Sequence, residues 1–164
     1  MFPVCFFFQT VIMRYWKRAT VCISSQVGCR MACRFCSTGT MGLLGHLTAG
    51  EMCEQLLHAS DVAPIRNVVF MGMGEPLDNY EELLGAVRAM VDPGRFGLSP
   101  AKVTVSTVGM VPRIRALARD VPGVRLALSL HAPTQELRCK IVPTARSWPL
   151  HSLMAAVDDY MVAR

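Results

Sequence analysis

Four short apolar stretches, each followed by a helical pattern, constrain the fold of this chain more than any other feature. The second stretch, residues 67–71, is continuously apolar, as expected of a strand that is buried on both faces. Strands that alternate with helices in this way form parallel sheets with right-handed crossovers. The pattern therefore predicts an α/β fold, and by itself it leaves open a closed barrel or an open wound sheet. The four predicted strands are residues 20–25, 67–71, 102–106 and 125–130.

The helices are predicted from their start signals and from the spacing of their apolar residues. Thr48 and Glu51 match a capping box, in which a hydroxyl and a carboxylate each satisfy a free backbone N–H group. Asp78 is expected to cap the next helix, and Ser147 or His151 the last one. The first predicted helix begins at residue 48, and the others cover residues 78–90, 112–119, 134–140 and 150–162. A weak alternation of apolar and polar residues over residues 10–16 predicts one further strand.

Three cysteines follow the first predicted strand with the spacing Cys-x3-Cys-x2-Cys. Cys29, Cys33 and Cys36 are close enough in sequence to bind one metal centre. Iron–sulfur clusters are held by cysteine thiolates, so three cysteines would leave one iron of a four-iron cluster open to a small molecule. A closed zinc site needs a fourth ligand, and His46 is the one candidate nearby. A merely buried cysteine cluster is less favoured, because Arg30 and Arg34 make this a poor core segment.

The same segment resembles a known family. Phe35 precedes Cys36, which gives Cys-x3-Cys-x-aromatic-Cys, the cluster motif of radical S-adenosylmethionine (SAM) enzymes. The longer string CISSQVGCRMACRFCSTG is similar to the RlmN/Cfr branch, which methylates adenine in RNA. The resemblance implies a 4Fe-4S cluster on Cys29, Cys33 and Cys36, with SAM on the open iron. It also implies a partial (β/α) barrel, with about four of six βα units in this chain, a lead-in strand in residues 1–19 and a partial radical SAM core in residues 20–164.

The predicted SAM residues all come at the carboxyl ends of predicted strands, where parallel α/β folds bind their ligands. The string MGMGEP resembles the GEP motif, in which Gly74 and Glu75 would hold the SAM amino group. A dinucleotide site is a weak alternative, because Leu77 stands where the third glycine belongs. The remaining SAM contacts implied by the resemblance are Ser106, Ser129, Leu130 and His131.

Cys22 matches a cysteine that, in the RlmN branch, helps to resolve a covalent protein–RNA adduct; a small buried strand residue is an equally weighted interpretation. The branch also uses a methyl-accepting cysteine near the carboxyl end and an amino-terminal accessory domain, and neither has a counterpart in this sequence. We therefore expect a family fragment, or a truncated gene product, that is inactive alone. The alternatives are a radical SAM enzyme of another reaction type and a non-enzymatic zinc or RNA-binding module.

The composition limits the cellular compartment and the kinds of binding partner that are expected. Seven cysteines, three of them in a motif that requires thiolates, indicate a reducing compartment, cytoplasmic or organellar. No apolar run approaches the roughly 20 residues that span a bilayer, so no membrane partner is expected. The net charge of +5 permits a polyanion, although no basic run is dense enough to mark an RNA site. The resemblance implies ribosomal or transfer RNA as substrate, favours carbon 2 of adenine, and implies an electron donor such as flavodoxin or ferredoxin.

Overall fold

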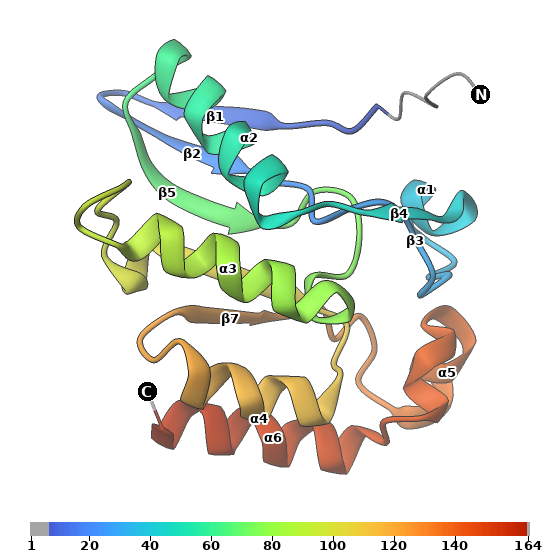
Figure 1. The fold of residues 1–164 in the computed structure, drawn as a ribbon. Coiled ribbons are helices and arrows are strands. Elements are labelled where there is room, and N and C mark those ends of the chain that lie inside the picture. Colours follow the sequence, from blue (N-terminus) through green and yellow to red (C-terminus); the bar gives the residue numbers. More distant parts are fainter. Residues whose placement is uncertain (1–6, 164) are drawn as a thin grey trace.

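The computed structural model describes residues 7–163 and contains a five-stranded main sheet in the order β1-β2-β5-β6-β7 (Figure 1). The outer strand β1 runs antiparallel to β2, and the other neighbouring pairs are parallel. The four predicted parallel strands and the strand predicted over residues 10–16 are therefore confirmed. Their bounds are β1 Val11–Tyr15, β2 Arg18–Cys22, β5 Ile65–Phe70, β6 Val103–Thr107 and β7 Arg125–Leu128.

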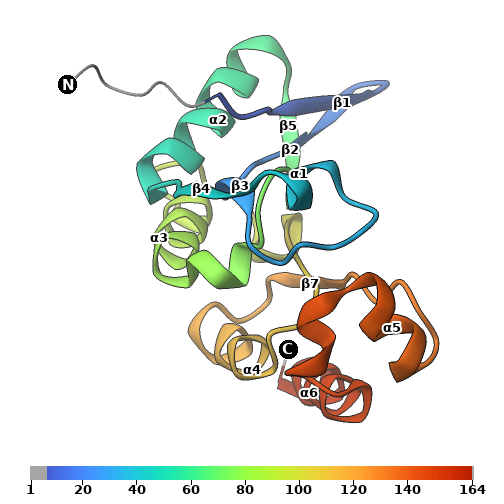
Figure 2. The same ribbon diagram turned by 90° about the vertical axis from the view of Figure 1, so that its right-hand side faces the viewer.

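Helices cover one face of this sheet (Figure 2). Strand residues such as Val21, Val68 and Val105 are fully buried there, in one apolar core with residues of α2, α3 and α4. The last helix, α6, packs beside α4 at the lower edge of Figure 1. The helices are α2 Ala49–Val62, α3 Tyr80–Val91, α4 Val111–Asp120, α5 Gln135–Ile141 and α6 Leu150–Ala163, with short 3-10 turns at Pro76–Asn79 (η1), Pro100–Lys102 (η2) and Pro143–Arg146 (η3).

The other face of the sheet carries smaller and more polar side chains. Cys22 pairs with Val69, which pairs with Thr104, and Ser106 follows two residues later on the same face. These side chains are only half-buried. One face covered by helices and a second, more polar face are what a parallel sheet that curves into a barrel presents, as in the predicted partial barrel type. An open wound sheet carries helices on both of its faces.

The cysteine segment is more ordered than the loop that the sequence predicted. Two short antiparallel strands, β3 (Gln26–Cys29) and β4 (Gly42–His46), flank it, with one helical turn, α1 (Ser37–Thr40), between them. Gly28 has a φ of +75° and lies directly against the backbone of Gly42. Two four- to five-residue strands rich in glycine give too weak an alternation to be recognised from sequence.

Two of the predicted helix caps are wrong and one is confirmed. Thr48 and Glu51 form the predicted capping box. Asp78 lies inside η1, and the residue before α3 is Asn79, which makes no side-chain cap. The N–H group of Leu150 at the start of α6 donates to Gln135 of α5 over 2.7 Å, so a distant side chain replaces the expected local cap from Ser147 or His151.

The expected domain boundary after residue 19 falls inside β2. The division into a lead-in strand and a core stays a prediction. Among the described residues, no helix is long and apolar enough to cross a membrane.

Candidate active site

A cavity of about 310 Å³ opens at the carboxyl edge of the main sheet, the edge that faces the viewer in Figure 2. The cysteine segment forms one wall, and the loops after β5, β6 and β7 form the others. The structure therefore brings together predicted residues from four separate parts of the sequence. Those that line the cavity are Cys29, Cys33, Cys36, Gly74, Glu75, Ser106, Ser129 and His131. Cys22 and Leu130 do not line it.

The glycines of the MGMGEP loop are required by a close approach between two backbone segments. A Cβ atom on Gly72 would lie 2.6 Å from the hydroxyl oxygen of Ser24, and one on Gly74 would lie 2.6 Å from Cβ of Gln26. Gly74 also has a φ of +101°, which favours glycine. The missing side chains thus face the polypeptide chain, so the room that they leave is used for packing and not for a ligand.

Gln26 is the centre of the hydrogen bonds that fix this loop. Its side chain is fully buried, and its Oε1 accepts the N–H of Glu75 over 2.8 Å. Its Nε2 donates to Asp78 over 2.8 Å and lies 3.1 Å from Nδ1 of His46. One amide side chain therefore joins the cysteine segment, the glycine loop and η1.

Ser24 and Gln55 extend this network to the helix layer. Gln55 of α2 accepts the N–H of Ser24 and donates to its carbonyl oxygen, both over 2.9 Å. The hydroxyl of Ser24 in turn accepts the N–H of Met73 over 2.9 Å. The glycine loop is thereby tied through Ser24 to α2.

Glu75 lies at the floor of the cavity with only 3% of its surface exposed. Its two carboxylate oxygens accept the N–H groups of Leu77 and Val108 over 3.1 Å and 2.9 Å. Burial outweighs these bonds and raises the pKa of the carboxyl from 4.5 to about 7. Glu75 therefore connects the loop after β5 to the end of β6.

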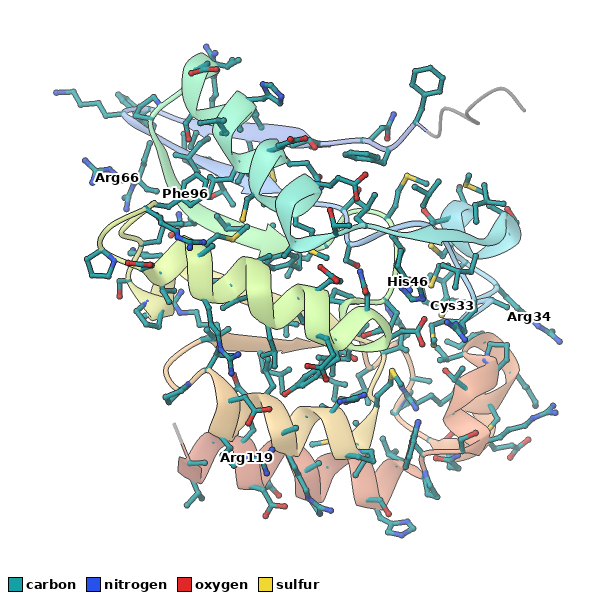
Figure 3. The ribbon with its side chains drawn as sticks, in the orientation of Figure 1. Cys33, Arg34, His46, Arg66, Phe96 and Arg119 are labelled. Atoms are coloured by element: carbon teal, nitrogen blue, oxygen red, sulfur yellow. The ribbon has the colours of Figure 1, made fainter. Side chains whose placement is uncertain are left out.

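The three cysteines lie against α5, and Figure 3 places Cys33 near this helix. Burial raises the pKa of the Cys29 thiol to about 11 and raises that of Cys33, with the negative charge of Glu75 as a further cause. His46, the alternative fourth ligand for zinc, does not line the cavity. Its ring nitrogens lie within 3.2 Å of Gln26 and Arg30, so both are engaged elsewhere.

The far wall of the cavity comes from β6 and from the segment after β7. The hydroxyl oxygens of Ser106 and Ser129 are 3.3 Å apart. The ring of His131 packs on that of Phe35, with centroids 4.1 Å apart, although His131 has a φ of +59° that non-glycine residues seldom adopt. The contact joins the cysteine segment to the end of β7 across the cavity mouth.

Arg138 supports this wall from behind. Its guanidinium belongs to α5, is fully buried, and donates to the backbone oxygens of Leu130 and Val108. Its Nη1 has no partner, and it forms no ion pair with a carboxylate within residues 7–163. Burial lowers the pKa of this guanidinium, while the nearby Cys139 and Cys33 raise it. A buried cation therefore holds together the segments that follow β6 and β7.

Comparison with known proteins identifies the family. The model of the radical SAM superfamily matches residues 23–157. The chain belongs to this superfamily. It is 49% identical over 161 residues to the "dual-specificity RNA methyltransferase RlmN 1" of Myxococcus xanthus, covering 95% of this chain and 45% of that protein. It is 48% identical over 170 residues to the probable RlmN enzyme of Mycolicibacterium smegmatis, covering 93% of this chain and 46% of the relative.

A solved radical SAM structure has the same fold. The crystal structure of a radical SAM methyltransferase from Sphaerobacter thermophilus matches with a TM-score of 0.89 and 45% identity, over 94% of this chain and 47% of that one. The chain thus spans a little under half the length of the relatives that it matches.

Membership of the radical SAM superfamily implies SAM and an iron–sulfur cluster, and the residues of the cavity fit both. Three thiols, the donors that iron–sulfur clusters use, line one cavity together with a carboxylate and three hydroxyl-bearing residues. Within residues 7–163 no three His, Cys, Asp or Glu side chains already form a group that holds a metal ion. An iron–sulfur cluster does not need such a group, because each of its cysteine thiolates binds a different iron.

The supporting residues are those that the sequence did not reveal. Gln26 directly follows the predicted strand over residues 20–25, and its neighbours Ser25 and Val27 give no local signal that its side chain is buried. Arg138 lies beside other polar and charged residues in a short predicted helix, where an arginine is expected to be exposed. Its burial depends on contacts with the segments after β6 and β7, and a local sequence pattern cannot predict such long-range contacts.

Proposed function

We propose that this chain is the cluster- and SAM-binding core of an RNA adenine methyltransferase of the RlmN type. The single observation that carries the proposal is the common cavity that Cys29, Cys33 and Cys36 share with the ends of three parallel strands. The names of the relatives, which are RNA methyltransferases, support the choice of reaction.

Cys29, Cys33 and Cys36 would hold three irons of a 4Fe-4S cluster and leave one iron without a protein ligand, available to SAM. When bound, the cluster supplies the electron that cleaves SAM into methionine and a 5′-deoxyadenosyl radical. The cofactors carry this chemistry, and the protein contributes position, electrostatics and the exclusion of water.

The other cavity residues bind and orient SAM in this proposal. Glu75 and the backbone of Gly74 meet the SAM amino group, whose positive charge would favour the ionised form of a carboxyl that burial keeps partly protonated. Ser106 and Ser129 offer hydroxyl groups that donate to the SAM carboxylate or ribose. His131 and Phe35, whose rings pack at a tilt, would cover one side of the bound SAM.

The finer assignments remain proposals drawn from the resemblance. They are carbon 2 of adenine in ribosomal or transfer RNA as methyl acceptor, flavodoxin or ferredoxin as electron donor, and a cytoplasmic or organellar setting. Cys22 lies on the sheet face of Ser106, outside the cavity lining, and its proposed role in resolving a protein–RNA adduct requires it to be reached from that face.

The test is anaerobic reconstitution with iron and sulfide, followed by reductant, SAM with a labelled methyl group, and unmodified ribosomal and transfer RNA. We expect a brown cluster and SAM binding. Glu75→Ala should weaken SAM binding about 10- to 100-fold without loss of the cluster, because a hydrogen bond to a charged group contributes roughly 1.5–3 kcal/mol. We expect no labelled methyladenosine from the chain alone. Uptake of zinc without cluster formation would exclude the radical SAM assignment of the cavity.

A further inference from the structure

A row of cations lies at the amino edge of the sheet, the edge opposite the cavity. A basic residue stands at or next to the start of each of the four parallel strands. Arg18 and Arg125 are the first residues of β2 and β7, Arg66 is the second residue of β5, and Lys102 directly precedes β6. Because the strands are parallel, their amino ends meet at one edge. All four side chains are exposed. We call these four residues the basic row.

Aromatic side chains adjoin this row. The turn between β1 and β2 projects Trp16, whose side chain is fully exposed at 101% and whose φ is +51°, and Tyr15 beside it is 75% exposed. Trp16 and Lys17 border one hollow of about 550 Å³ together with Arg18, Arg66, Asn67 and Lys102. Figure 3 places Arg66 at the end of the molecule opposite Cys33.

No carboxylate of the described residues pairs with the cations of this surface. None of Lys17, Arg18, Arg66, Lys102 or Arg125 forms an ion pair within residues 7–163, and no acidic residue lines the hollow. Outside this surface, six exposed basic side chains form an ion pair with a carboxylate, for example Arg115 with Asp159. An unpaired row of cations beside an exposed indole therefore suits an anionic ligand that also offers flat, apolar faces.

We propose that the basic row and Trp16 form a docking surface for RNA, with phosphates on the cations and an unpaired base stacked on the indole. Lysine and arginine neutralise phosphates, and base–aromatic stacking is the usual complement on single strands. The choice of RNA rests on the proposed function.

The position of the surface suits docking and not catalysis. Strands of four to six residues rise about 3.3 Å per residue. The basic row therefore lies on the order of 15–20 Å from the cavity, a span that one folded RNA can cover. An RNA held at the amino edge could present another segment to the cavity.

Fluorescence anisotropy with a labelled RNA stem-loop tests the cations. The double variant Arg66→Gln/Lys102→Gln should bind about tenfold more weakly at low salt, and the slope of log K against log salt should fall by about 1.4, because each phosphate contact on a single strand contributes about 0.7. Arg115→Gln/Arg119→Gln, two exposed and ion-paired arginines of α4, is the matched control and should change neither value.

The indole has a test of its own. Trp148→Phe leaves Trp16 as the only tryptophan of the two in the chain. RNA should then quench the fluorescence of Trp16, and Trp16→Ala should weaken RNA binding about tenfold.

Several results would overturn the inference: no RNA binding, equal weakening in the α4 control, unquenched Trp16, or equally tight binding of anionic lipid vesicles. Cluster assembly and SAM binding, measured on the same variants, should stay as in the unchanged chain. If RNA does not bind while SAM does, the docking surface fails and the proposed function keeps its own test. If RNA binds but neither a cluster nor SAM does, the proposed function fails and the docking surface stands.

Discussion

The two edges of the main sheet present polar side chains in opposite ways. At the carboxyl edge, Glu75, Gln26 and Arg138 are buried, and each is bonded to the backbone of another segment. At the amino edge, Arg18 and Arg66 stand in solvent without an ion pair among the described residues. Buried polar groups must be satisfied to be tolerated, whereas exposed charges cost little and contribute little. The same strands therefore present a rigid cavity at one end and an adaptable charged surface at the other.

The largest expected effect removes the ligands of the cavity. Changing any one of Cys29, Cys33 or Cys36 to Ala should abolish stable cluster assembly, because two remaining thiolates leave two irons without a protein ligand. Iron and sulfide content after anaerobic reconstitution measures this. Cys53→Ala, a half-buried change inside α2, is the control and should retain the cluster. The reverse result, with Cys53→Ala losing the cluster and Cys33→Ala keeping it, would refute the assignment.

A second effect comes from the buried carboxyl of Glu75, in the chain without iron or SAM. Its pKa is about 7 in the folded state and 4.5 in the reference state, so the folded state keeps a proton that the unfolded state releases. Its contribution to stability is fully present below pH 4.5 and is lost as the pH rises through about 7. The loss is on the order of 3 kcal/mol.

Urea titrations between pH 4.5 and 8 measure this loss as a fall in the free energy of unfolding. Glu75→Gln removes the titrating group and should give a flatter profile. Identical profiles for the two proteins would mean that another group causes the dependence.

A somewhat smaller effect is expected at the glycine loop. Gly74→Ala places a methyl group against Gln26 at a φ of +101° and should lower the free energy of unfolding by about 2–3 kcal/mol. Gly45→Ala is the matched control, since a Cβ atom there meets nothing within 4 Å. The urea midpoints of both variants settle the comparison. If both lose the same stability, the close approach of Gly74 to Gln26 is unimportant.

The smallest effect is expected at the amino edge. Arg66→Gln and Arg18→Gln should each change the free energy of unfolding by less than about 0.5 kcal/mol, because neither side chain is buried or ion-paired among the described residues. SAM affinity should also be unchanged. A loss of more than about 1 kcal/mol by thermal or chemical unfolding would show that this edge, too, is part of the structural framework.

The contrast between the edges also explains what the sequence could reveal. Strands and helix caps are specified by residues that are close together in the sequence. This holds for the apolar strand residues Val68 and Val105 and for the capping pair Thr48 and Glu51, so the sequence predicts these elements close to their observed bounds. The cysteine spacing is local in the same sense. The residues that line the cavity were found because the family motifs mark them.

Long-range partners could not be predicted in this way. Gln26 and Glu75 are 49 residues apart in sequence, and Arg138 reaches Val108 across 30 residues. Asp78 looked like a helix cap because its bond to Gln26 and its ion pair with Arg30 are invisible to a local pattern. The basic row is not visible in the sequence for the same reason, because its members are scattered along the chain and only the parallel strands align them.

The bond between Gln26 and the N–H of Glu75 has a consequence for how the chain folds. Forming it closes a loop of 49 residues, a step whose entropic cost must be met by contacts made at the same time. Those contacts are the pairing of β2 with β5 and the packing of α2 against them. The cysteine segment therefore acquires its native neighbours only in the cooperative step that pairs the strands, and iron that arrived earlier would meet three thiols on an unstructured chain.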